Sequence, residues 1–256
     1  MTTPFRLCKQ LFQTTAMSLA LLTAFSAEAE TAPDPVALVS AADAARFPRD
    51  SFQVDIDIVS RSVDDNDGEK KRYRVLSKGQ DDTVVLTMEP VSDRGQILLM
   101  NGRNLWVFLP SVSQPVRLSL AQRLTGEVAN GDLARANFTG DYTPTYLGTA
   151  SLDGEPAHVL DLTAVDGSVT YARVKYWIRQ SDNRPLKAEF YALSGRLLKT
   201  CVYEDFKQMA GALRPTRLVM RDALKNGNVS ILTYSAMNPR PLPNKLFTKE
   251  YLKKLN

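Results

Sequence analysis

The sequence has 256 residues, 44% of them hydrophobic, and a formal net charge of +4 at pH 7. It is long enough to form one large all-β domain or two small ones, and no Pro/Gly/Ser-rich linker divides it. Because no run of lysines and arginines is interleaved with aromatic residues, the composition argues against nucleic-acid binding. The mild basic excess leaves an anionic lipid surface open as a partner.

The first 29 residues have the pattern of a secretory signal peptide. A positively charged start precedes an apolar run over residues 16–26, and residues 27–29 form a small-x-small cleavage site. A membrane-spanning helix needs about 20 apolar residues, so this run is too short to cross a bilayer. We therefore expect export to a bacterial periplasm, cleavage after about Ala29, and one domain over residues 30–256.

Two cysteines occur in the sequence, and only Cys201 would remain after processing. A single thiol cannot form an internal disulfide, so burial alone has to stabilise the fold in an oxidising compartment. Cys201 lies in the strand-like run LLKTCVYEDF, which favours a buried and unreactive thiol.

An amphipathic helix is predicted directly after the leader. Asp34 can cap its first turn, and Pro48 ends it. The apolar face of this helix needs a sheet to cover, and it is predicted to consist of Val36, Val39, Ala42 and Phe47.

From Ser51 onward the hydrophobic period changes to two, which predicts β-strands. In the first of them Asp55 and Asp57 alternate with apolar residues and should face solvent. Further strands are predicted over residues 71–78 and 83–90. Five hairpin turns are predicted downstream, at Asn101-Gly102, Asp153-Gly154, Asp166-Gly167, Ser194-Gly195 and Asn226-Gly227.

These turns are too short for crossover helices, so the sheet should be antiparallel. About eleven strands are more than a twisted open sheet holds without curling. The predicted fold is therefore mainly β, an incomplete and strongly curved antiparallel β-barrel with a few short α-helices that form a lid or plug. The last helix is expected in the tail over residues 246–256.

The central segment, Leu118–Tyr142, is the only long stretch in the middle of the chain without strand alternation. The strand before it, residues 104–110, is apolar on both faces, although a sheet with one wet face should alternate. We interpret the central segment as a mobile lid or plug over an apolar cavity, with Gly126, Gly131 and Gly140 as hinges. An ordinary surface excursion with permanently packed leucines is the alternative. The residues predicted to line the cavity and the lid are Leu86, Met88, Trp106, Phe108, Leu120, Leu124, Val128, Leu133, Phe138, Phe190 and Met220.

No concentrated polar motif points to catalysis or metal binding. His158 is the only histidine, and no nucleophile motif accompanies it, so we expect a strand histidine with a hydrogen-bonding partner. One histidine and one remaining cysteine leave no zinc or copper site. The acidic residues 64–69 lack the glutamate that closes a calcium loop. We therefore expect no enzymatic activity, no cofactor and no metal.

Three stretches carry a family pattern: NGRNLWVFLPSVSQPVRL, RLTGEVANGDLARANFTGDY and LPNKLFTKEYL. Together they resemble the outer-membrane lipoprotein-sorting protein family, the LolA-like periplasmic carriers. The resemblance implies an incomplete β-barrel around a hydrophobic cavity with helices as a lid. It also implies a monomeric carrier that moves lipids, or the acyl chains of lipoproteins, from an inner-membrane transporter of the ABC or RND type to the outer membrane. The chain is longer than the best-known carrier and its lid sequence differs, so the cargo stays open.

The main alternative is a lipid-sensing regulatory or accessory module of such an exporter, because a periplasmic regulator of an anti-sigma factor uses a similar half-barrel. Such regulators usually add a second small domain, whereas only a short tail follows Pro243. We therefore expect the carrier. A periplasmic hydrolase is the third hypothesis, and replacing His158 would test it.

Overall fold

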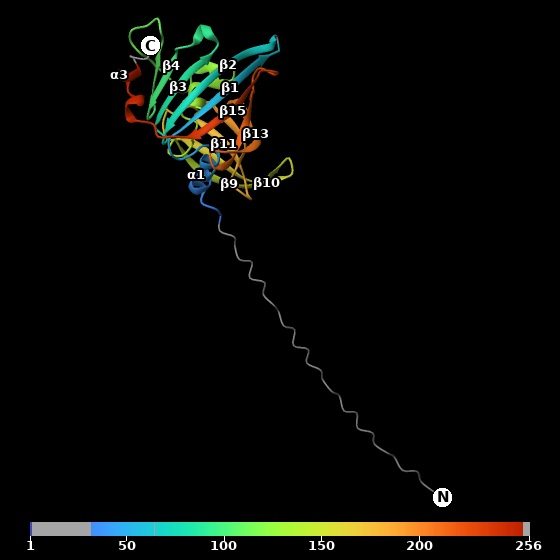
Figure 1. The fold of residues 1–256 in the computed structure, drawn as a ribbon. Helices are drawn as coiled ribbons and strands as arrows, with labels where there is room; N and C mark the ends of the chain where they lie inside the picture. Colours follow the sequence, from blue (N-terminus) through green and yellow to red (C-terminus); the bar gives the residue numbers. More distant parts are fainter. Residues whose placement is uncertain (2–31, 64, 253–256) are drawn as a thin grey trace. The chain divides into compact units, whose positions relative to one another are not determined.

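The structure is a computed structural model that describes Met1, residues 32–63 and residues 65–252 (Figure 1). Apart from Met1, the predicted signal peptide and its cleavage site lie outside the described residues. Within those residues, no helix is long and apolar enough to span a bilayer.

The predicted N-terminal helix is present as α1 (Pro35–Arg46). The Asp34 carboxylate caps it by accepting a hydrogen bond from the Val36 backbone N–H at 2.9 Å. The predicted apolar face is wrong at Val36, which is 56% exposed. The buried face includes Asp43 and Arg46, so this helix carries two charged groups into the core.

Within the described residues, thirteen strands form one antiparallel sheet in the order β6-β5-β4-β3-β2-β1-β15-β14-β13-β12-β11-β10-β9. The strands from the first part of the chain are β1 (Phe52–Ser62), β2 (Asp65–Lys78), β3 (Asp82–Glu89), β4 (Ile97–Asn101), β5 (Asn104–Phe108) and β6 (Val116–Leu118). Those from the second part are β9 (Tyr142–Leu152), β10 (Glu155–Ala164), β11 (Arg173–Arg179), β12 (Pro185–Tyr191), β13 (Leu197–Met209), β14 (Ala212–Asp222) and β15 (Val229–Pro239). A short 3-10 turn, η1 (Val91–Asp93), joins β3 to β4.

The mainly-β antiparallel architecture agrees with the prediction, but the strand number of about eleven is too low. The sheet is not closed, because β6 and β9 are its two edges. The central segment, predicted to lack strands, contains β7 (Arg123–Thr125) and β8 (Val128–Ala129), which pair with each other, and the short helix α2 (Asn130–Ala134).

The predicted hairpin turns agree with the structure to different degrees. Asp153 and Gly154 both adopt positive φ angles, 52° and 86°, as a tight two-residue turn requires. The turn predicted at Asp166-Gly167 is instead part of a longer loop, because β10 ends at Ala164 and β11 begins at Arg173. Val169 and Tyr171 in this loop are buried, so apolar alternation continues where pairing has stopped.

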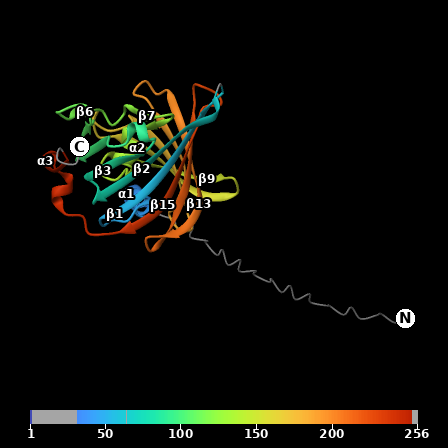
Figure 2. The ribbon, with the colours of Figure 1, turned by 45° about the horizontal axis from the view of Figure 1, so that its top comes forward.

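The main core lies on the inner face of the curved sheet. Figure 2 shows α1 and α2 beside the inner surface of the strands, with β1, β2, β15 and β13 passing across them. Inward-facing residues of the strands, α1 and the central segment form one cluster of buried side chains, which we call the inner cluster. Its largest fully buried members include Ile56, Leu105, Leu120 and Tyr176.

A second cluster, which we call the outer cluster, covers the opposite face of β3, β4 and β5. On β4, Leu98 and Met100 belong to the inner cluster, while Ile97 and Leu99 belong to the outer one. The outer cluster is completed by the C-terminal segment, residues 240–252, which contains η2 (Asn244–Phe247) and α3 (Lys249–Leu252). The second apolar face of the strand before the central segment is therefore covered by the C-terminal segment.

Candidate functional site

The residues predicted to form the cavity and its lid lie on two faces of the sheet. The inner cluster contains Leu120, Leu124, Val128, Leu133, Phe138, Phe190 and Met220. The outer cluster contains Leu86, Trp106 and Phe108. Met88 belongs to neither of these two clusters; it is half-buried at a bulge in β3, where the pairing with β2 skips one residue. Because side chains alternate along a strand, the three residues of the outer cluster do not share a space with the central segment. The sequence pattern identified a strand with two apolar faces but assigned both faces to one cavity.

The central segment fills the inside of the curved sheet with its own apolar side chains. Leu120, Val128, Leu133 and Phe138 are each at most 6% exposed. The Phe138 ring packs edge-on against Tyr176 of β11 at a centroid distance of 5.1 Å. Burying a side chain of this size contributes about 1.5–3 kcal/mol, so this filling is a large part of the stability of the fold.

Little empty space remains between the central segment and the apolar inner face of the sheet, although a more open hollow of about 190 Å³ lies beside Gly126 and Glu127, next to Lys199 and Asp222. One cavity of about 20 Å³ lies between it and Phe190, Tyr203 and Met220. A second of about 30 Å³ lies between it and Phe52, Ile56 and Val75. Each has room for about one or two waters, whereas a cavity of about 150 Å³ is needed to hold even benzene. These two cavities in the apolar interior are therefore too small for an acyl chain while the central segment is in place.

A buried ion pair joins the central segment to β13. Lys199 Nζ donates to Asp132 Oδ2 at 2.6 Å and to the Glu127 carbonyl oxygen at 2.6 Å. Asp132 also accepts hydrogen bonds from the Ala129 backbone N–H and from the Tyr171 hydroxyl. Both oxygen acceptors of the lysine ammonium are thus part of the central segment, and the pair joins α2 to the inner face of the sheet.

The two buried charges of α1 bind the next part of the segment. Asp43 Oδ2 accepts hydrogen bonds from the backbone N–H groups of Phe138 and Thr139, at 2.9 and 2.8 Å, and from the Thr139 hydroxyl. Arg46 donates to the Ala136 carbonyl oxygen at 2.7 Å, and its guanidinium lies over the Phe138 ring. Burial raises the pKa of the Asp43 carboxyl above its ordinary value, although Arg46 and the three donors act in the opposite direction.

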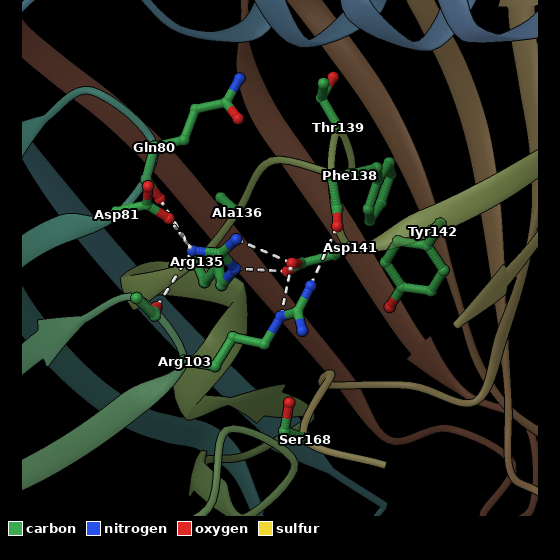
Figure 3. A network of polar contacts seen from close by, with 12 residues as sticks. Gln80, Asp81, Arg103, Arg135, Ala136, Phe138, Thr139, Asp141, Tyr142 and Ser168 are labelled. Atoms are coloured by element: carbon green, nitrogen blue, oxygen red, sulfur yellow. Dashed lines mark hydrogen bonds and ion pairs between the residues drawn. The ribbon is translucent and has the colours of Figure 1, made fainter. Parts of the chain in front are cut away.

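A third set of polar contacts fixes the segment at the rim of the sheet (Figure 3). Arg135 donates to both carboxylate oxygens of the buried Asp141 and to Asp81 in the turn before β3. Arg103, from the turn between β4 and β5, donates to Asp141 as well, at 2.9 Å. Arg135 also donates to the carbonyl oxygens of Gln80 and Gly102. One end of the central segment is therefore bound to two strand turns.

The glycines predicted as hinges have another structural requirement. A Cβ atom on Gly131 would lie 2.0 Å from Thr170 Oγ1, and one on Gly126 would lie 2.1 Å from Ser60 Oγ. Only glycine allows the segment to approach the wall this closely. Gly140 has a φ of +81° and open space around it, so its backbone conformation is its only constraint. Whether any of the three acts as a hinge stays a prediction.

Lys199, Asp43 and Arg46 were not among the site residues predicted from the sequence, although the sequence pattern indicates that they are buried. Lys199 alternates in phase with Cys201 and Tyr203, which belong to the inner cluster. Asp43 and Arg46 follow Val39 and Ala42 at helical spacing. A charged residue at a position where the period requires an apolar one indicates a buried partner, because an unpaired buried charge is too costly.

The residues with reactive side chains are placed as expected for structural roles. Cys201 is fully buried, and burial raises the pKa of its thiol to about 12, so it stays protonated at neutral pH. His158 Nδ1 lies 3.2 Å from the Tyr146 hydroxyl, the hydrogen-bonding partner that was predicted, and partial burial lowers its pKa. Among the described residues, no group of three or more His, Cys, Asp or Glu is arranged to hold a metal ion.

The fold is an open, curved antiparallel sheet with an apolar filling on its inner face. Comparisons with known proteins show which family has this fold. A LolA superfamily protein from Nitrosomonas europaea is 56% identical, with a TM-score of 0.82 over 86% of this chain and 100% of that chain. The chain therefore belongs to the LolA superfamily. A family model described only as an uncharacterised protein matches residues 79–254. A search of curated proteins gave no match.

Two more distant structures share the fold. A protein domain from Vibrio parahaemolyticus, described as outer membrane lipoprotein-sorting, is 20% identical, with a TM-score of 0.74 over 86% of this chain and 98% of that chain. A DUF1329 family protein from Desulfovibrio piger is 20% identical, with a TM-score of 0.72 over 86% of this chain and 100% of that chain. At this identity they support the architecture alone.

Proposed function

We propose that this protein is a periplasmic carrier that binds acyl chains of lipids or lipoproteins inside the curved sheet. It would receive them from an inner-membrane transporter of the ABC or RND type and deliver them to the outer membrane as a monomer. The observation that carries the proposal is that one continuous segment supplies much of the apolar filling of an open sheet. Membership of the LolA superfamily supports it.

The energetics of transfer explain why such a filling is useful. Each CH2 group of an acyl chain gains about 0.8 kcal/mol when it is buried, so a chain leaves a membrane readily only for a comparably dry site. An empty apolar cavity of that size would be costly to the unloaded protein. Leu120, Val128 and Leu133 occupy the space until cargo replaces them.

The way the segment is attached supports its displacement as a unit. Between β6 and β9 it contains only the short elements β7, β8 and α2. Its buried charged contacts lie at three places, namely Lys199, the α1 pair of Asp43 and Arg46, and the arginines at the rim. Hydrogen bonds of Thr125 to Glu69 and of Glu127 to Ser230 hold it at the other end. Charged hydrogen bonds can be replaced by water once the segment leaves, whereas the hydrogen bonds of the sheet stay intact.

A photoreactive fatty acid tests the proposal on the full mature chain. After irradiation, peptides are identified by mass spectrometry. The expected adducts lie on the inner wall around Phe190 and Met220 and on the central segment. Peptides of β5 that carry Trp106 and Phe108 serve as an internal control, because these residues lie in the outer cluster. Adducts confined to the β5 peptides, or none above a non-acyl diazirine control, would show that the inner site is not used.

A further inference from the structure

A basic hollow lies at the rim where the central segment meets the turns of the sheet. It has a volume of about 460 Å³ and is lined by Asp81, Gly102, Arg103, Asn104, Arg117, Arg135 and Ser168. Its three arginines come from three places in the chain: Arg103 from the turn between β4 and β5, Arg117 from the edge strand β6, and Arg135 from the residue after α2. Figure 3 shows Arg103 and Arg135 directed toward Asp141, with Ser168 beside Arg103.

The carboxylates around these arginines fall into two kinds. The Asp141 side chain is 3% exposed and bonds to both Arg103 and Arg135, so it is a fixed part of the fold. The side chains of Asp81 and Asp166 are 71% and 52% exposed, and each pairs with one arginine. Exposed ion pairs contribute little to stability, so both carboxylates can be exchanged for a stronger anion.

Arg117 provides the free donors of the hollow. Its side chain is exposed, it donates one hydrogen bond to Asn104 Oδ1, and within the described residues it has no carboxylate partner. A guanidinium group presents a planar set of N–H donors that matches the oxygens of a phosphate. The hydroxyl of Ser168 donates to Asp166 Oδ1, so it can turn to the same anion once Asp166 is displaced.

We propose that this hollow binds a phosphate group, and that in the carrier the phosphate belongs to the headgroup of the cargo lipid. The second part rests on the proposed function. A phosphate between Arg117, Arg103 and Arg135 replaces Asp81 and Asp166 and leaves the contacts to Asp141 in place. Because Arg135 follows α2 directly, the headgroup is held beside the point at which the acyl chain has to pass the central segment.

The test compares three probes by isothermal titration calorimetry on the full mature chain: dihexanoyl phosphatidic acid, dihexanoylglycerol and inorganic phosphate. The first two share their acyl chains and differ in the phosphate. The variant is Arg117→Gln, which removes the free guanidinium and leaves the Arg103 and Arg135 contacts intact. The matched control is Arg196→Gln, an exposed arginine in the turn between β12 and β13.

For phosphatidic acid, Arg117→Gln should weaken binding about tenfold, the effect of losing a charge-assisted hydrogen bond, while Arg196→Gln should not. Dihexanoylglycerol should bind more weakly than phosphatidic acid, and neither variant should change its affinity. A different result is that Arg117→Gln weakens the binding of inorganic phosphate, while phosphatidic acid binds no more tightly than dihexanoylglycerol. The hollow would then be an anion site whose ligand is free phosphate and not a lipid headgroup.

Two results separate this inference from the proposed function. Equal binding of the two lipids, with no effect of Arg117→Gln on any probe, overturns the phosphate site while acyl binding stands. Failure of both lipids, together with Arg117-dependent binding of inorganic phosphate, overturns the carrier proposal while the site stands.

Discussion

Lys199 on β13 and Asp132 in α2 form an ion pair of 2.6 Å in which both side chains are at most 7% exposed. Lys199 belongs to the sheet and Asp132 to the central segment, so the pair has to break if the segment leaves the sheet. Breaking one partner of a buried pair costs about 3–5 kcal/mol, because the other charge is left uncompensated. This contact is therefore expected to be a main energetic barrier to any displacement of the central segment.

Replacing Lys199 with methionine tests that control. Lys199→Met should lower the free energy of unfolding by about 3 kcal/mol and make the thiol of Cys201 react faster with a maleimide under native conditions. Urea unfolding and thiol-labelling rates provide the two measurements. Lys207→Met, an exposed lysine on the same strand, is the matched control. Identical behaviour of the two variants would show that the ion pair does not hold the segment.

The close approach of Gly131 to Thr170 predicts a second stability effect. Gly131→Ala places a methyl group where Thr170 Oγ1 lies 2.0 Å away, so the segment or the loop has to shift. We expect a loss of about 2 kcal/mol, which corresponds to a fall in Tm of about 4–8 °C for a domain of this size. Gly167→Ala is the control, because nothing lies within 4 Å of its added methyl group. Thermal melts of the two variants that coincide would contradict the packing shown here.

The pair formed by Glu127 and Asp222 predicts a pH dependence. Burial, followed by repulsion from and hydrogen bonding with Asp222, raises the pKa of Glu127 above its ordinary value of 4.5. Burial alone would also raise the pKa of Asp222, but the backbone N–H groups of Lys225 and Leu224 and other partners lower it. The folded protein therefore holds a proton on Glu127 at a pH where the unfolded chain has lost it. The contribution of Glu127 to stability is greatest below about pH 4.5 and falls as the pH rises through its folded pKa.

Replacing Glu127 with glutamine should remove the part of the fall in stability at higher pH that comes from ionisation of Glu127. At pH 7 we expect Glu127→Gln to be more stable than the wild type by less than about 1 kcal/mol, since the group is partly exposed and the interaction is screened. At pH 4 the difference should disappear, because the carboxyl is protonated there. Urea unfolding at a series of pH values measures both, with Glu250→Gln at an exposed site as the control. A difference that grows toward low pH would have the wrong sign for this pair.

The outer cluster predicts how tryptophan fluorescence behaves. Trp106 lies beneath Lys249, whose ammonium is 3.7 Å from the ring centroid, and not in the inner cluster. In a Trp177→Phe background, an acyl ligand should therefore leave the emission of Trp106 unchanged. Phe247→Ala should shift that emission to longer wavelength and cost about 3 kcal/mol, because it removes a buried ring from the C-terminal segment.

Leu193→Ala is the control for that loss, since Leu193 is 94% exposed. An emission shift on addition of the acyl ligand, in protein that keeps its C-terminal segment, would move the binding site to the outer face.

Local patterns in the sequence predict much of the fold. The alternation of polar and apolar residues predicts strands, and turn pairs such as Asp153-Gly154 predict the hairpins and hence the antiparallel order. The pattern also predicts that Leu120, Val128 and Leu133 are buried, because a segment with this apolar content next to a two-faced strand needs a shared core.

The rest of the fold depends on contacts between residues far apart in the sequence, and the alternation of polar and apolar residues does not predict which segments meet. Periodicity shows that Leu98 and Leu99 lie on opposite faces, but not which face receives the central segment and which receives the C-terminal one. It likewise shows that Lys199 lies in phase with apolar neighbours, but not that Asp132, from a distant part of the chain, supplies the countercharge.

The outer cluster gives β3, β4 and β5 a second hydrophobic layer that does not involve the central segment. These strands contact the inner cluster on one face and Leu242, Phe247 and Leu252 on the other. If the central segment withdraws, as the proposed function requires, the three strands lose inner packing but keep this outer layer. The C-terminal segment would then act as a backing that keeps this part of the sheet ordered while cargo replaces the inner core.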